Sequence, residues 1–142
     1  DLGTGKLRPT GTRTAFAARI SGEGDPAWVT LLPSDIETYP LAVRRDPGGG
    51  ILAALGVTGD LSAAGVTADT GADSLVFVRL DEAGNVEWAR NVGGIILATG
   101  VGLTETPTGY ALAYGGYAGT LNLGALGPAN GASDAFVATL LP

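Results

Sequence analysis

The sequence contains no cysteine, no histidine and no methionine among its 142 residues. Without cysteine there is no disulfide framework, and the usual zinc ligands and His- or Cys-based nucleophiles are absent too. We therefore predict no catalytic residues, no metal site and no cofactor. Without methionine the chain has no initiator of its own, which favours a processed or excised part of a longer protein.

Positive charge is scarce as well. Lys and Arg total 8 against 14 Asp and Glu, so the net charge is −6 and the pI is about 4.3. A polyanion would repel such a chain, so we predict no nucleic-acid partner. The stretch Thr106–Ser133 carries no charge, but Gly, Pro, Thr and Asn interrupt it throughout. We therefore predict no membrane insertion.

Glycine is abundant, with 24 residues, and 45% of the chain is apolar. The apolar residues are mainly Ala, Val, Leu and Ile in short runs, and glycines separate these runs. Short apolar runs between frequent turns are typical of a sheet protein, and no helical periodicity of useful length is present. The composition therefore predicts an all-β fold.

A shift of 60 residues aligns the sequence with itself without a gap. The most informative matches are Trp28 with Trp88, Arg19 with Arg79, Pro47 with Pro107 and Gly24 with Gly84. A fixed period with turn and apolar positions in phase indicates a repeat architecture. We predict a linker or the end of a preceding repeat at 1–10, repeats at 11–70 and 71–130, and the first strand of a third at 131–142.

Each repeat is predicted to contain four short strands. The first is apolar on both faces, so it must be covered on both faces. The aligned Gly24 and Gly84 suit turns that need a positive φ, and Asp81 with Asn85 suits an Asx-type turn rather than a calcium loop. The predicted strands are 14–20, 27–32, 39–44 and 51–57, then 74–80, 86–92, 98–103 and 110–117, and finally 134–140.

Two segments carry a family resemblance: Phe77–Arg90, with the sequence FVRLDEAGNVEWAR, and Tyr114–Gly124, with the sequence YGGYAGTLNLG. Together with Asp134–Ala138 they resemble the bacterial β-propeller repeat of the SBBP type. Asp134 matches the family's Asp at the start of the first strand, where the other copies have Ser74 and Thr14. The resemblance implies four-stranded antiparallel propeller blades, either as one domain or as a fragment of a larger propeller.

The resemblance also implies a secreted or cell-surface bacterial protein with a structural or recognition role and no enzymatic activity. Because Trp28 and Trp88 recur at one position, we expect them to pack rather than to face a ligand. An exposed binding surface for a glycan or protein is better sought at strand residues Tyr110, Tyr114 and Tyr117.

One alternative function stays open at this point. A carbohydrate-active or other hydrolytic propeller could use Asp and Glu, and the sequence offers Asp35 with Glu37, Asp69 with Asp73, and Asp81 with Glu82. A glycosidase needs two carboxylates at a defined separation, which sequence spacing does not give.

The unaccompanied third copy of the first strand would leave an apolar sheet edge open. We therefore expect self-association, or pairing with the remainder of a longer propeller chain.

Overall fold

The computed structural model describes residues 6–46, 48–61, 66–67, 73–96, 100–105, 111–123 and 132–140. These residues form strands and turns and no helix, which confirms the all-β prediction. No helix in this part of the chain is therefore long and apolar enough to cross a membrane. The strands are β1 (Ala15–Ile20), β2 (Pro26–Leu32), β3 (Glu37–Arg45), β4 (Ile51–Thr58), β5 (Asp60–Leu61), β6 (Val66–Thr67), β7 (Ser74–Leu80), β8 (Val86–Ile96), β9 (Gly102–Glu105), β10 (Ala111–Leu121) and β11 (Asp134–Leu140).

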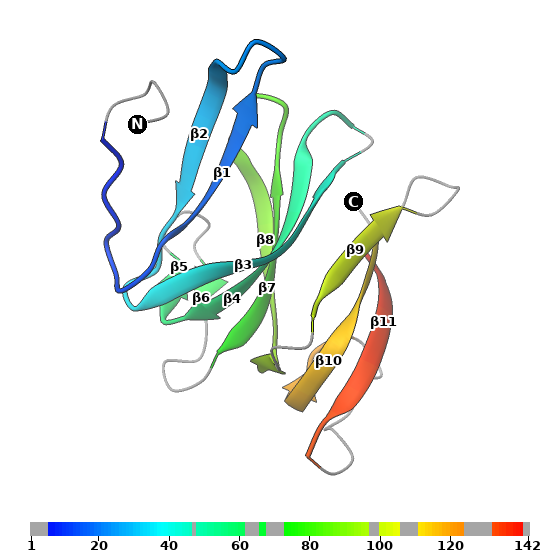
Figure 1. Cartoon of the computed structure of the whole chain (residues 1–142). Helices are drawn as coiled ribbons and strands as arrows, with labels where there is room; N and C mark the ends of the chain where they lie inside the picture. Colours follow the sequence, from blue (N-terminus) through cyan, green and yellow to red (C-terminus); the bar gives the residue numbers. More distant parts are fainter. Residues whose placement is uncertain are drawn as a thin grey trace.

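One antiparallel sheet of seven strands dominates the structure (Figure 1). Its order is β11-β10-β8-β7-β4-β3, and β9 pairs with β10 next to β8. The sheet curls strongly, in the manner of a half-barrel. The β1–β2 hairpin forms a separate two-stranded sheet, and β5–β6 forms a second small one.

The pairing registers recur at an interval of 60 residues. All seven pairs of β4 with β7 return as the seven pairs of β10 with β11, so that Ala54 opposite Phe77 becomes Tyr114 opposite Val137. The irregularity after Arg19 in β1–β2 returns after Arg79 in β7–β8. The internal periodicity of the sequence is therefore also a periodicity of backbone pairing.

Sequence and structure differ mainly in how strands join and end. The first two strands of the segment 11–70 do not pair with its last two; instead β4 pairs with β7 of the segment 71–130. A continuous four-stranded set, β3-β4-β7-β8, therefore crosses the boundary between the sequence repeats. β8 and β10 extend further than expected, β9 begins four residues later than expected, and the β5–β6 pair was not expected.

The core consists of two clusters on opposite faces of β4 and β7, because these strands are apolar at nearly every position. Phe77 and Leu75 face a cluster that includes Phe136 and Leu121. Val76 and Val78, which alternate with them along β7, face a second cluster. There the β1–β2 hairpin covers the sheet with Ala15 and Leu32. β7 is thus buried on both faces, as a doubly apolar strand requires.

The turn between β7 and β8 has the predicted Asx geometry. Asp81 Oδ1 accepts hydrogen bonds from the backbone N–H groups of Ala83, at 2.9 Å, and Asn85, at 2.8 Å. The Asn85 side chain donates to Asp81 Oδ2, and these bonds lower the pKa of Asp81. Gly84 has a φ of 86° and Gly24 a φ of 95°, which confirms that both turns need a residue free of Cβ strain.

We expect Val78→Ala to lower the free energy of unfolding by about 2–3 kcal/mol, because Val78 is fully buried between two layers. Val137→Ala is the matched control, since Val137 lies on β11 with 68% of its surface exposed. It should change stability by less than about 0.5 kcal/mol. Urea denaturation of both variants measures the difference. Equal losses would contradict the layered core.

Candidate functional site

Two of the three tyrosines predicted to form a binding surface, Tyr114 and Tyr117, differ in exposure. Tyr114 is 47% exposed and its ring lies against Gly102 on the paired strand β9. Tyr117 is only 4% exposed and packs edge-on against Phe136, with ring centroids 6.3 Å apart. Tyr110 lies outside the described residues. Of the two described rings, that of Tyr114 reaches solvent.

The two tryptophans are half-buried and occupy different surroundings. Trp28 lies over Gly84 in the β7–β8 turn, and its Nε1 donates to the Glu82 carbonyl at 2.9 Å. Trp88 packs against the core cluster around Phe77. Asp134 begins β11 and its carboxylate accepts from the adjacent backbone N–H of residue 135 at 2.9 Å.

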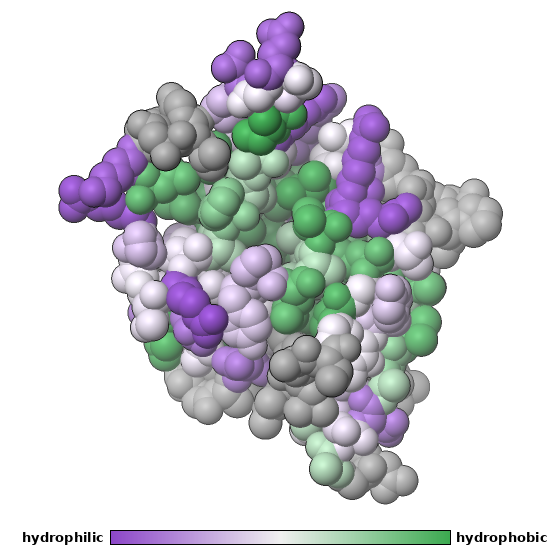
Figure 2. All heavy atoms as spheres, in the orientation of Figure 1, coloured by the Kyte–Doolittle hydropathy of each residue, from purple (hydrophilic) through white to green (hydrophobic). Residues whose placement is uncertain are grey.

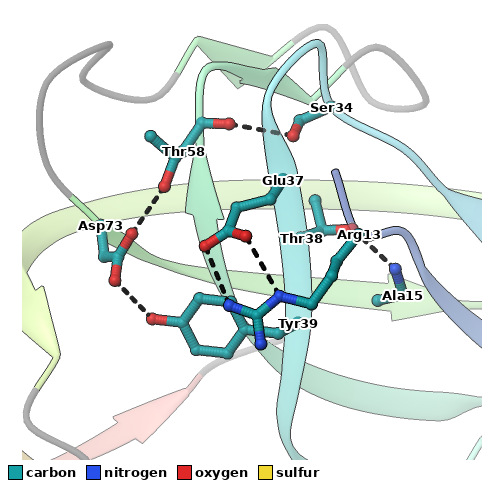
Figure 3. A network of polar contacts seen from close by, with 8 residues as sticks. All are labelled: Arg13, Ala15, Ser34, Glu37, Thr38, Tyr39, Thr58 and Asp73. Carbon is teal, nitrogen blue, oxygen red and sulfur yellow. Dashed lines mark hydrogen bonds and ion pairs between the residues drawn. The ribbon is translucent and has the colours of Figure 1, made fainter. Parts of the chain in front are cut away.

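A network of polar side chains lies where the start of β1, the start of β3 and the segment before β7 meet (Figure 3). Arg13 forms a two-pronged contact with the Glu37 carboxylate, with both N···O distances 3.1 Å. Its guanidinium also lies over the ring of Tyr39, 5.3 Å from the centroid. The Tyr39 hydroxyl donates to Asp73 at 2.8 Å, and the Thr58 hydroxyl donates to the other oxygen of Asp73 at 2.6 Å.

The backbone places Tyr39 by pairing it with a glycine. Tyr39 on β3 is opposite Gly56 on β4, and a Cβ at that position would collide with the tyrosine ring. Next to it, the buried Thr38 hydroxyl accepts from the Ala15 N–H and donates to the Leu32 carbonyl, each at 2.7 Å. Thr38 therefore fixes the β1–β2 hairpin to the edge of the large sheet.

A cavity of about 690 Å³ opens beside this network. The N-terminal segment and β1, β2 and β3 form its walls. Apolar groups dominate the lining, and Arg8 and Arg13 supply its charge; the apolar side chains are Leu7, Pro9, Phe16, Leu31, Tyr39 and Pro40. Apolar walls with a few polar groups are typical of ligand sites, so this is the candidate functional site of the described residues.

Space-filling shows how apolar residues reach the surface (Figure 2). Green patches lie among purple charged side chains rather than beneath a continuous polar layer. Phe16 is among the exposed residues, with 55% of its surface accessible. Such exposed apolar area is compatible with binding of a partner or ligand.

The surroundings of Tyr39 in this network favour the protonated form of its hydroxyl. Burial, and then the hydrogen bond to Asp73, raise the pKa of Tyr39 to about 12. The hydrogen bond and charge of Glu37 raise the pKa of Arg13. Both carboxylates are thus engaged by donors from their own chain. The arrangement is that of a structural junction, in which neither carboxylate is aimed at the cavity as an unpartnered acid or base.

Sequence reasoning identified Glu37 and Asp73 as acidic residues but did not place them together with Arg13 and Tyr39. The partners lie 24 and 34 residues apart along the chain, and no local pattern signals such contacts. Asp35 has a separate role, since it accepts from the Asp60 N–H at 2.6 Å. In the described part of the chain, no group of three or more acidic side chains could hold a metal ion.

Comparison with known proteins adds no relative. No model of a protein family matches the chain, and no curated protein matches it. The resemblance to bacterial β-propeller repeats therefore stays a prediction from the motifs.

We expect Tyr39→Phe to lower the free energy of unfolding by about 1–2 kcal/mol, because it leaves one Asp73 oxygen without its donor. Tyr114→Phe is the control, since the Tyr114 ring is 47% exposed. It should be nearly neutral. Thermal or urea denaturation gives both values, and an unchanged stability for Tyr39→Phe would contradict a structural role for the network.

The raised pKa of Tyr39 also predicts how stability depends on pH. The folded pKa of about 12 exceeds the ordinary value of 10, so folding holds this proton more tightly than the unfolded chain does. This contribution to stability is complete below pH 10 and is lost as the pH rises towards 12. The wild type should lose more stability over that interval than Tyr39→Phe. Parallel curves for the two proteins would refute the assignment.

Proposed function

We propose that this chain is a non-enzymatic structural or recognition module of a bacterial surface or extracellular protein. Its strands belong to β-propeller-type blades of the SBBP kind, and the module associates with further copies or with the rest of a longer propeller chain. A glycan or a protein is the proposed class of ligand. The carrying observation is the recurrence of pairing registers every 60 residues.

The blade interpretation draws on how the strands are layered. The set β3-β4-β7-β8 is antiparallel throughout and runs through consecutive neighbours, as a four-stranded blade does. β9-β10-β11 repeats the first three of these strands in the same registers. The β1–β2 hairpin repeats the last two, and it packs face to face on the middle set. Three successive layers with doubly apolar strands between them support stacked blades.

The non-enzymatic part of the proposal draws on what surrounds the acidic residues. Glu37 is paired with Arg13, and Asp73 accepts from Tyr39 and Thr58. Asp81 is occupied by its own turn. A hydrolytic propeller needs two carboxylates that face a substrate across a defined gap. These carboxylates instead hold segments of the chain together.

For recognition, the cavity beside Tyr39 and the exposed ring of Tyr114 are the candidate contact points. Aromatic rings supply apolar area with a polar edge, which suits a sugar ring or a peptide side chain. Because Tyr39 and Tyr114 lie on paired strands, the scaffold holds their rings in fixed positions.

The purified chain should show no turnover with a broad panel of glycoside, ester and peptide substrates. The reason is that the carboxylates of Glu37, Asp73 and Asp81 are engaged in structural hydrogen bonds and that the chain has no His or Cys. A mock purification controls for contaminating hydrolases. Turnover that disappears in Glu37→Gln or in Asp73→Asn would overturn the non-enzymatic proposal.

A further inference from the structure

Trp28 and its neighbours Thr30 and Arg19 join the β1–β2 hairpin to the next layer. Trp28 Nε1 donates to the carbonyl of Glu82, and Thr30 Oγ1 donates to the carbonyl of Gly84 at 2.6 Å. The indole lies directly on Gly84, where a Cβ would come within 2.6 Å of Cδ2. Arg19, paired with Trp28 across the hairpin, reaches the Glu82 carboxylate at 3.3 Å. All of these contacts are made to the β7–β8 turn.

Trp88 is the counterpart of Trp28, but among the described residues no turn packs on it; the guanidinium of Arg90 lies over its ring instead, 5.2 Å from the centroid. It is paired with Arg79 on β7 just as Trp28 is paired with Arg19 on β1. The Nε1 of Trp88 is buried and has no hydrogen-bond acceptor among the residues that the structure describes. A buried donor without an acceptor is rare in folded proteins and calls for a partner group. By analogy with Trp28, that partner is the carbonyl of a hairpin turn.

The β1–β2 turn is a turn of the required kind. Ser21 N–H donates to the Asp25 carbonyl and Gly24 N–H to the Ser21 carbonyl, which are the bonds that also close the β7–β8 turn. Gly24 has the same left-handed conformation as Gly84. No described residue comes within 4 Å of the position that a Cβ would take on Gly24. Among the described residues, Trp88 therefore has no turn packed on it, and the β1–β2 turn has no tryptophan packed on it.

β1 also carries the sequence needed to occupy the place of β11. Ala15, Phe16 and Ala18 recur in β11 as Ala135, Phe136 and Ala138. β11 uses one of its edges to pair with β10. The equivalent edge of β1 is unpaired among the described strands, because β1 forms a ladder only with β2. Phe16 is 55% exposed, whereas its counterpart Phe136 is 3% exposed. β1 therefore presents outward the side chain that β11 buries.

We propose that the β1–β2 hairpin of a second copy docks on β10 in place of β11, with its turn beneath Trp88. The carbonyl of Gly22, which corresponds to that of Glu82, then accepts from Trp88 Nε1. β2 of the second copy supplies the fourth strand that the set β9-β10-β11 lacks. This inference rests on the proposed structural role and names the surfaces through which copies associate.

The occupant is a second copy because the chain's own hairpin lies on the far side of β7 from the cluster that contains Phe136. Ala15 and Leu32 of that hairpin pack in the cluster with Val76 and Leu80, on the other side of β7. Pairing of two β11 edges would also bury apolar area, but it would bring no turn carbonyl to Trp88. The docked hairpin would pair with β10 and would also bring a turn carbonyl to the buried N–H of Trp88.

Cross-linking tests the register directly, because the chain has no cysteine of its own. Ala113 is paired with Ala138 in β11, and the exchange would place Ala18 of the second copy there. Two single variants, Ala113→Cys and Ala18→Cys, should therefore form a disulfide-linked heterodimer when mixed and oxidised, since opposed strand residues lie within disulfide reach. Ala17→Cys is the matched control; its side chain leaves the opposite face of β1, so it should not cross-link to residue 113.

Sedimentation measurements supply a second test. Deleting residues 134–140 should strengthen association, because β11 competes with the incoming hairpin for β10. Trp88→Phe keeps an aromatic side chain but removes the donor, and it should weaken association about three- to tenfold. Circular dichroism verifies that each variant remains folded.

Three outcomes would overturn the inference. These are equal cross-linking of the Ala17 and Ala18 variants to residue 113, loss of association on deleting residues 134–140, and a monomer with no cross-link at any concentration. None of them bears on hydrolysis, so the inference can fail while the non-enzymatic proposal stands. Substrate turnover would overturn that proposal without changing the cross-linking result.

Discussion

The structure depends on one constraint: its central strands are apolar on both faces. A strand such as β7, with Val76, Phe77 and Val78 fully buried, cannot lie at the surface of a single sheet. It needs a layer on each side, and the chain supplies one with the β1–β2 hairpin and the other with β10 and β11. Each layer in turn leaves a similar face outward, which is why apolar side chains such as Phe16 and Val137 reach the surface at the two ends.

Polar contacts then fix how the layers meet. The apolar faces are built from Ala, Val and Leu, which pack with little directional preference. Direction comes from Thr38, which bonds to the backbone of both β1 and β2, and from Trp28, which grips the β7–β8 turn. The Tyr39 network adds a third junction at the start of β3. Hydrogen bonds in such places contribute little net stability each, but they select one arrangement of the layers.

The same logic links the cavity to the proposed association. The cavity lies beside β1, whose outer edge forms no ladder among the described strands. In the middle layer, β4 pairs along the equivalent edge of β7. Recognition and assembly would therefore draw on one feature, the periodic need of each layer for a neighbour. A ligand in the cavity and a docking strand would compete for the Phe16 side of β1.

The sequence by itself determined the all-β class, the 60-residue period and most strand positions. These follow from local signals: apolar runs that mark strands, and turn residues such as Gly24 and Asp81 that mark where strands end. Only the tertiary structure decided that β4 pairs with β7 across the repeat boundary and that Tyr39 meets Asp73. It also decided that Tyr117 is buried while Tyr114 is exposed. The physical reason is that pairing partners and burial depend on which surfaces cover one another across tens of residues, and no local pattern encodes that choice.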